Sequence, residues 1–194
     1  MKTKFLFLSI LILLFIASSI QAQELSEEQM KEMYELMLPG EEHNLLKQFE
    51  GKWITQYIYR MAMDQEPITS PGESDIEMIL DGRFLRWTST GDMMGQKVES
   101  LTIIGFDRRF KYFTIYGFDT MGTYAVSAEG EIDPETNIIT FEGTNYEPAF
   151  EKETKYLMKF DTSDKDKIDF SVLFETPDGS DFFPIMQITG IRTK

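Results

Sequence analysis

Residues 152–175 read KETKYLMKFDTSDKDKIDFSVLFE and contain the clearest structural pattern in the chain. Apolar or aromatic side chains occupy every even position in two stretches. In residues 155–160 they are Tyr156, Met158 and Phe160, and in residues 168–174 they are Ile168, Phe170, Val172 and Phe174. Side chains two apart point to the same face of a β-strand, so each stretch predicts a strand with one apolar face. The polar residues 161–166 between them predict a turn. The two strands therefore form an antiparallel hairpin.

The same two-residue period begins at Trp53 and continues to the end of the chain. Turn residues such as Asp81-Gly82 and Asp133-Pro134 separate the periodic stretches. The predicted strands cover residues 52–61, 73–80, 83–90, 96–106, 111–118, 123–132, 137–143, 152–161, 167–175 and 181–193. Ten consecutive strands with no helix between them predict an all-β fold, a single antiparallel meander. We expect it to close into a barrel, because closure covers the apolar face and leaves no exposed sheet edge.

A short helical segment precedes the strands. Ser26 and Gln29 have the spacing of a capping box, in which each side chain bonds to the other residue's backbone N–H. Apolar residues then recur at helical spacing until Pro39-Gly40, and residues 41–49 predict a second short helix. We expect this segment, residues 23–50, to cap one end of a barrel formed by residues 51–194.

Residues 1–22 have the layout of a secretory signal peptide. Lys2 and Lys4 are followed by the apolar run Phe5–Ile16 and by small and polar residues that end at Ala22. An uncleaved membrane anchor is the alternative, but a spanning helix needs about 20 apolar residues and this run is shorter. We therefore expect cleavage after Ala22, no membrane span in the mature chain, and a periplasmic or extracellular location. Removing 22 of the 194 residues, and two lysines with them, leaves 172 residues and changes the formal charge from −14 to −16.

The composition excludes whole classes of function. A formal charge of −14 argues against a nucleic-acid partner, because proteins that bind phosphates cluster Lys and Arg. The chain has no cysteine, which excludes disulfides, thiolate nucleophiles and Cys-ligated metals. One histidine excludes schemes that need two, and no phosphate-binding glycine loop occurs. The acidic turn 161–166 lacks the glycine of a calcium loop, so we predict no metal site.

Gly51-Lys52-Trp53 opens the first predicted strand directly after the second helix, and Arg192 lies in the last strand. This arrangement resembles lipocalin-like (calycin) barrels, in which a tryptophan after Gly-x closes one end and an arginine from the final strand lies across it. The resemblance implies that Trp53 and Arg192 form a structural pair at the closed end of the barrel. A guanidinium on an indole face gains cation–π attraction while its N–H groups reach nearby carbonyl oxygens.

A longer series of motifs resembles a bacterial family known as domain of unknown function 1579. The matching segments, in chain order, are residues 39–43 (PGEEH), 51–53 (GKW), 79–85 (ILDGRFL), 91–96 (GDMMGQ) with Glu99, 105–107 (GFD), Tyr112, 118–121 (FDTM) and 129–130 (EG). Phe106 departs from the pattern, because the family usually has Gly-Tyr-Asp there. The resemblance implies a lipocalin-like barrel, usually bacterial and often with a signal peptide, and it implies no reaction.

Four polar residues within predicted strands are candidates for a site. Arg86, Glu99, Tyr116 and Asp119 form an orienting polar patch if one strand face lines an apolar cavity. The alternative is that most of them face solvent or pair with one another as a structural ion network.

Methionine and aromatic side chains extend this candidate site. Met93, Met94 and Met121 fall in predicted turns, where they either ring the mouth of the barrel or pack on its end. The predicted ligand-binding residues are Tyr57, Arg86, Glu99, Tyr116, Asp119 and Met121.

His43 is the one imidazole of the chain and the usual kind of group to titrate near neutral pH. On a short helix that caps a barrel, we interpret it as a hydrogen-bonded structural histidine. Haem ligation through His43 is the lesser alternative, because related ten-stranded barrels that hold haem use a histidine near the C-terminus, where this chain has none. We predict no cofactor.

Two classes of function fit these observations, with a third as a plainer alternative. The first is an exported barrel that binds a small apolar or amphipathic molecule, supported by the predicted fold and dense aromatics. The second is an enzyme that transfers a proton with Glu99 or Asp119 as base and Tyr116 as acid. The third is an envelope protein whose acidic surface or Met-rich first helix binds another protein. We favour the binding protein, because catalytic side chains are few. The sequence fixes neither the ligand nor the oligomeric state.

Overall fold

The computed structural model describes residues 25–93, 95–147 and 151–193, and the predicted signal peptide at residues 1–22 lies outside them. The chain divides into two compact units, one ending at Met37 and one formed by residues 38–194. In the first unit, helix α2 (Glu27–Leu36) begins with the predicted capping box: the Gln29 N–H donates to Ser26 Oγ at 3.1 Å, and the Ser26 N–H donates to Gln29 Oε1 at 2.9 Å. No helix among the described residues is long and apolar enough to cross a membrane.

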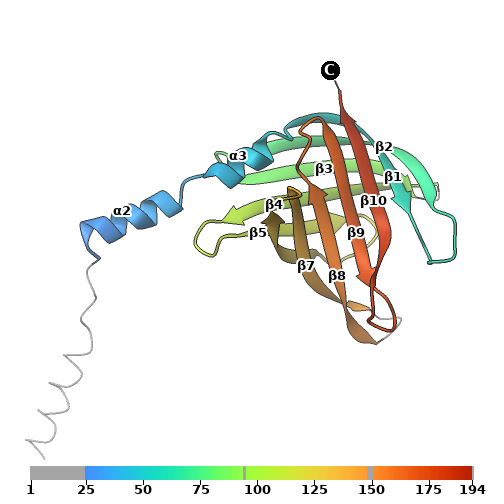
Figure 1. Ribbon diagram of the computed structural model, residues 1–194. Helices are drawn as coiled ribbons and strands as arrows, with labels where there is room; N and C mark the ends of the chain where they lie inside the picture. Colours follow the sequence, from blue (N-terminus) through green and yellow to red (C-terminus); the bar gives the residue numbers. More distant parts are fainter. Residues whose placement is uncertain (1–24, 94, 148–150, 194) are drawn as a thin grey trace, which may run out of the picture. The chain divides into compact units, whose positions relative to one another are not determined.

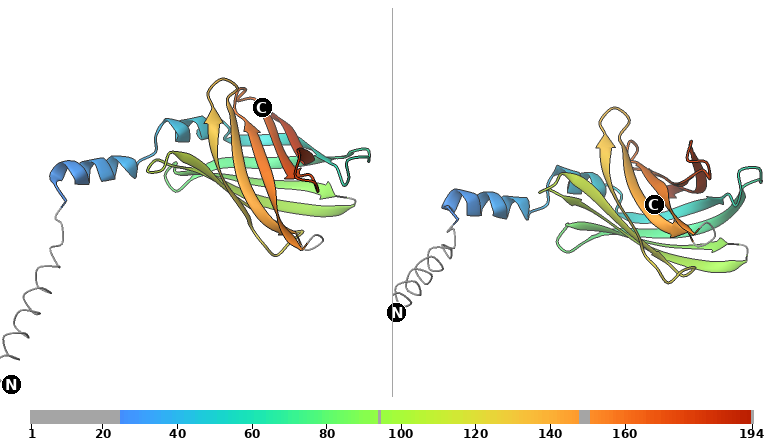
Figure 2. Two further views of the ribbon diagram at one scale, coloured as in Figure 1. Left: turned by 60° about the horizontal axis from the view of Figure 1, so that its bottom comes forward. Right: turned by 90° about the horizontal axis from the view of Figure 1, so that it is seen from below.

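The second unit is a closed barrel of ten antiparallel strands (Figure 1). The strands are β1 (Gly51–Tyr59), β2 (Ile68–Ile79), β3 (Phe84–Met93), β4 (Gln96–Asp107), β5 (Tyr112–Asp119), β6 (Val126–Asp133), β7 (Ile138–Glu147), β8 (Lys152–Asp161), β9 (Lys167–Glu175) and β10 (Phe182–Arg192). Each strand pairs with the next along the chain, and β10 pairs with β1 to close the barrel (Figure 2). The predicted all-β, ten-stranded meander is confirmed.

Strand β2 begins five residues earlier than predicted, at Ile68 instead of residue 73. The sequence Pro71-Gly72 predicts a break in the strand, because proline lacks an N–H and glycine favours turns. Both residues nevertheless pair within the sheet, Pro71 opposite Gln56 and Gly72 opposite Thr55. Packing requires glycine at position 72, because a Cβ there would lie 2.4 Å from Cε2 of Tyr57. The glycine therefore makes room for a tyrosine ring inside the barrel.

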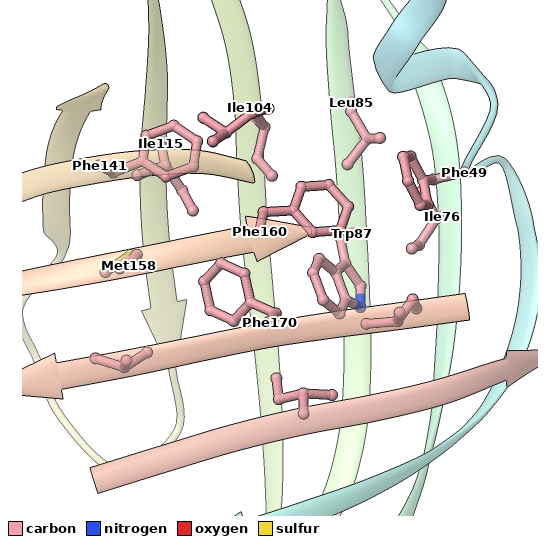
Figure 3. Close-up of a cluster of buried hydrophobic side chains, with 14 of the residues drawn as sticks. Phe49, Ile76, Leu85, Trp87, Ile104, Ile115, Phe141, Met158, Phe160 and Phe170 are labelled. Carbon is pink, nitrogen blue, oxygen red and sulfur yellow. The ribbon is translucent and has the colours of Figure 1, made fainter. Parts of the chain in front are cut away.

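Helix α3 (Glu41–Lys47) belongs to the barrel unit and lies at the end where β1 begins (Figure 1). Its Leu46, and Phe49 just after it, are completely buried. The Phe49 ring packs on Phe160 with ring centroids 4.7 Å apart and stacks with Trp53 at 6.4 Å. Ile76 and Leu85 lie in the same cluster (Figure 3). These side chains fill the barrel interior at this end, which we call the closed end.

Trp53 and Arg192 pair directly across the β1–β10 seam that closes the barrel. The Arg192 guanidinium carbon lies 4.3 Å from the centre of the Trp53 ring, and the indole Nε1–H donates to the Phe49 carbonyl at 3.1 Å. The guanidinium also donates to the carbonyl oxygens of Gln48, Glu50 and Lys165. One side chain thus ties together the α3–β1 turn, the β8–β9 turn and the last strand.

We expect Arg192→Ala to lower the free energy of unfolding by about 2–3 kcal/mol, because it removes a cation–π contact and several charge-assisted hydrogen bonds. Arg192→Lys keeps the charge but loses the planar fork, so it should retain only part of this stability. Urea unfolding monitored by circular dichroism measures both. Arg109→Ala is the comparison variant, since Arg109 is an exposed side chain whose ion pair is with one carboxylate, Asp107, and its loss should cost at most about 1 kcal/mol. Equal effects at positions 109 and 192 would contradict this role.

Candidate ligand-binding site

The opposite end of the barrel is not filled in the same way. Because β1 runs from Trp53 at the closed end towards Tyr59, the connections that follow the odd-numbered strands lie at this second end, which we call the mouth. A cavity of about 770 Å³ extends from the mouth into the barrel. Its volume is within the range of small-molecule sites, roughly 300–1,000 Å³.

Aromatic and methionine residues make up about half of the residues that line the cavity. The aromatic lining residues are Tyr57, Tyr59, Trp87, Phe118, Tyr124, Tyr156, Phe170 and Phe174. The methionines are Met61, Met93, Met121, Met158 and Met186. Such a surface favours binding of apolar groups, since burying apolar area gains about 25 cal/mol per Å² and rings add geometric preferences.

Trp87 lies between the filled and the open parts of the interior. Its ring packs on Phe160, at 6.0 Å between centroids, and meets Phe170 edge-on at 5.6 Å (Figure 3). Phe160 belongs to the completely buried core and does not line the cavity, whereas Phe170 does. Trp87 is only 2% exposed, so it forms the inner limit of the cavity.

Two buried hydrogen-bonding groups of the lining lack a partner among the described residues: the Tyr57 hydroxyl and the Trp87 indole Nε1–H. Buried polar groups are nearly always hydrogen-bonded, and leaving one unpaired costs about 1–3 kcal/mol. The other tryptophan obeys the rule, because the Trp53 Nε1–H donates to a backbone carbonyl. Both residues line the cavity through their rings, while the two unpaired atoms themselves are covered by neighbouring side chains.

Tyr57 lies against the wall on two glycines that face each other across β2 and β3. Gly72 pairs with Gly91, and a Cβ on either would come within 3.0 Å of the Tyr57 ring. The ring also stacks with Tyr59, with centroids 5.9 Å apart and planes 8° apart. The glycines therefore hold the phenol flat along the wall and keep the cavity open beside it.

The electrostatic environment near the mouth disfavours negative charge. Burial raises the pKa of Tyr59 to about 12, and the nearby Tyr57, Asp119 and Asp92 contribute in the same direction. Among the described lining residues, the charged ones are Arg60 and Asp119. Asp119 accepts hydrogen bonds from the backbone N–H groups of Met121 (2.8 Å) and Gly122 (3.2 Å), so it also shapes the β5–β6 turn at the mouth.

The structure places half of the predicted ligand-binding residues at the cavity. Tyr57, Asp119 and Met121 line it, as does the half-buried Met93. Met94 lies outside the described residues.

The other three predicted residues lie on the outer face of the barrel. Arg86 pairs with Glu77 at 2.7 Å, in line with the structural ion-pair alternative. Glu99 is exposed and bonds to Lys97 at 2.6 Å, which lowers the pKa of its carboxyl group. Tyr116 is 46% exposed. The polar patch is therefore not assembled inside the barrel, and the proposed base Glu99 and acid Tyr116 of the enzyme alternative do not share the cavity.

The lining also contains polar residues that the sequence analysis did not single out. Ser89, Ser100 and Thr102 carry hydroxyl groups on cavity-facing positions of β3 and β4, and Asn145 on β7 adds an amide. The two-residue alternation of the strands could have identified them, because they lie an even number of positions from the buried Leu85 on β3 or Ile104 on β4 and so point to the same face.

His43 lies at the closed end, away from the cavity lining. It is 6% exposed, its ring meets Phe106 edge-on, and its Nδ1 accepts the Gly40 N–H at 3.0 Å. Burial lowers the pKa of this imidazole, the nearby Glu42 opposes that shift, and Arg108 and Arg83 add to it. Accepting a hydrogen bond requires a neutral ring with its proton on Nε2. The described residues contain no group of three or more His, Cys, Asp or Glu arranged to hold a metal ion.

Comparison with known proteins identifies the family. Residues 38–192 match the model of the family described as "Protein of unknown function (DUF1579)", and the chain belongs to this family, as its motifs predict. Among solved structures, Rv2717c from M. tuberculosis matches with a TM-score of 0.55 and 12% identity, over 78% of this chain and 96% of that one. At this identity the likeness concerns the fold. No curated protein matches the chain.

We expect the stability of the barrel to decrease as the pH falls below about 6.5, the ordinary histidine value. The folded protein holds His43 neutral, so in this range the unfolded chain binds more protons and protonation favours unfolding. The free energy of unfolding should keep falling until the pH reaches the lowered pKa of His43 in the folded state. Urea unfolding between pH 7.5 and 5.5 measures this dependence of stability on pH.

His43→Gln is the informative variant, because it removes the only histidine. It should abolish the pH dependence in this range, and an unchanged slope in the variant would show that His43 is not its origin.

Proposed function

We propose that this protein is an exported binding protein that holds a small apolar or amphipathic molecule inside its barrel. The observation that carries the proposal is the cavity of about 770 Å³, whose lining is rich in aromatic and methionine side chains. A molecule seated there gains from burial of apolar surface.

The character of the mouth supports entry of a flexible or variable ligand. Met61, Met121 and Tyr124 lie at the rim and are largely exposed, although they are apolar. Methionine side chains adapt to ligands of different shape because they are unbranched and polarizable. Exposed apolar groups around an opening are typical of sites that cover a bound molecule.

The cavity favours binding over catalysis. A general acid or base needs a titratable side chain within hydrogen-bond reach of the substrate. Among the described lining residues, the two charged ones are Arg60 and Asp119, and both lie at or beside strand ends at the mouth. Deeper in the barrel the described lining is uncharged. Asp119 is exposed and already accepts two backbone hydrogen bonds.

We expect native mass spectrometry of the protein purified from its own host to detect an additional, organic-extractable mass. Val172→Trp should lower the amount of this mass, because Val172 lines the cavity and the larger indole takes up part of the space. Leu173→Trp is the matched control: the neighbouring side chain on β9 is not part of the lining and the same substitution should leave the mass in place.

Circular dichroism of both variants checks that the barrel is folded. Absence of any bound mass from the wild-type protein, or equal amounts of it in folded Val172→Trp and Leu173→Trp, would contradict binding in the cavity.

Export is the second part of the proposal, and it is supported by the signal-peptide pattern of residues 1–22. N-terminal sequencing of the protein recovered from the host should start at Gln23. Replacing Ala22 with a bulky residue, Ala22→Trp, should block this cleavage and leave the precursor in the membrane fraction, since signal peptidases require a small residue at the cleavage site. An unprocessed protein recovered from the cytoplasm would refute export.

A further inference from the structure

Asp119 brings a carboxylate to the inner face of the barrel at the mouth. It is the last residue of β5 and lies an even number of positions from the buried Phe113 and Ile115, so it belongs to the inward-facing set of that strand. It lines the cavity, and among the described lining residues it is the one acidic side chain. A negative charge is therefore built into the wall beside the opening.

The β5–β6 turn holds this carboxylate by one of its two oxygens. The backbone N–H groups of Met121 (2.8 Å) and Gly122 (3.2 Å) both donate to Asp119 Oδ1. Asp119 Oδ2 has no hydrogen bond or ion pair within the described part of the chain, and the residue is exposed. The turn thus fixes the position of the carboxylate and leaves Oδ2 for a molecule at the mouth.

The Ser100 hydroxyl lies beside the carboxylate. Asp119 and Ser100 are direct partners in the β4–β5 pairing, and opposed side chains on one face of a sheet lie close together. Ser100 is half-buried and lines the cavity, and its hydroxyl makes no hydrogen bond to another described residue. The next serine along this row, Ser89, is already bonded to Ser74 at 3.0 Å. The mouth therefore presents a carboxylate and a hydroxyl as neighbouring acceptors.

An ammonium group matches this pair of acceptors. It has donors only, so it can donate to Asp119 Oδ2 and to the Ser100 Oγ at the same time, and its charge strengthens the bond to the carboxylate. Tyr59 and Tyr124, which also line the cavity, offer ring faces that attract a cation. A ligand carboxylate in this place would meet a like charge, and a neutral alcohol would gain no charge attraction.

The wider electrostatic field favours a cation as well. The formal charge of the chain is −14, which attracts cations and repels anions at long range. Burial raises the pKa of Tyr59, and Tyr57, Asp119 and Asp92 add to that shift, so negative charge is felt inside the mouth. Arg60 follows β1, which β2, β3 and β4 separate from β5, and within the described residues no ion pair joins it to Asp119. The protein therefore leaves the charge of Asp119 for a ligand.

We propose that the ligand is a cationic amphiphile, with its protonated amine between Asp119 and Ser100 at the mouth and its apolar body in the aromatic and methionine-rich cavity. This inference rests on the proposed binding function and specifies the chemistry of the ligand. It separates organic amines from alcohols and from fatty-acid anions of the same size.

Three naphthalenes of similar size test the proposal by isothermal titration calorimetry at neutral pH. 2-Naphthylethylamine carries a positive charge, 2-naphthylethanol is neutral, and 2-naphthylacetate carries a negative charge. We expect the amine to bind most tightly and the carboxylate most weakly. Raising the salt concentration should weaken binding of the amine relative to that of the alcohol, because salt screens the attraction between charges near the surface.

Asp119→Asn is the decisive variant, because the amide oxygen can still accept the two turn N–H groups while the charge is lost. It should weaken binding of the amine by about five- to tenfold, as expected for a partly exposed charge-assisted hydrogen bond, and leave binding of the alcohol unchanged. Ser100→Ala should weaken amine binding by about two- to fivefold.

Asp133→Asn is the matched control for Asp119→Asn. Asp133 is likewise the last residue of its strand, β6, and accepts the backbone N–H two residues further on, that of Glu135, at 2.8 Å. It lies at the closed end, outside the cavity lining, so the same change of charge there should leave amine binding unchanged. Circular dichroism checks that all three variants are folded.

The outcomes separate this inference from the function on which it rests. If the alcohol binds as tightly as the amine, or if Asp119→Asn and Asp133→Asn have equal effects, the cationic ligand is refuted and an apolar binding site remains. Tightest binding of 2-naphthylacetate also refutes the cationic ligand and indicates an anion site. If none of the three probes binds, the inference and the proposed binding function both fail.

Discussion

Closure of the barrel depends on the contact between Arg192 and Trp53 at the seam of the first and last strands. The two residues are direct partners in the β1–β10 pairing, so the cation–π contact fixes the register of the seam. A shift by one residue would turn each side chain of a strand to the opposite face. The inward positions of β1, including Tyr57, thus depend on an interaction at the other end of the molecule.

Filling one end of the barrel leaves the other end open. Ten strands enclose a wider interior than eight, and aromatic packing around Phe49, Trp53 and Phe160 fills it only at the closed end. Beyond Trp87 a cavity of about 770 Å³ remains. Gly72 and Gly91 beneath Tyr57 contribute directly, because they let a large ring lie flat where any side chain would push it inward. The cavity is thus a consequence of specific small residues placed opposite aromatic ones.

The sequence predicted the fold well and the site only in part, and the difference has a physical cause. Strand number follows from alternation and turn residues, which are local. Which face of a strand points inward is harder to predict from the sequence around a cavity. On β4 the inward positions are Val98, Ser100 and Thr102. The outward positions include Leu101 and Ile103. Here the polar residues face inward and apolar residues face outward, the reverse of a filled core. Arg86 and Glu99 are attractive as candidates because they are charged, and the same charge explains why they lie outside: among the described lining residues, charged side chains occur only near the mouth, at Arg60 and Asp119.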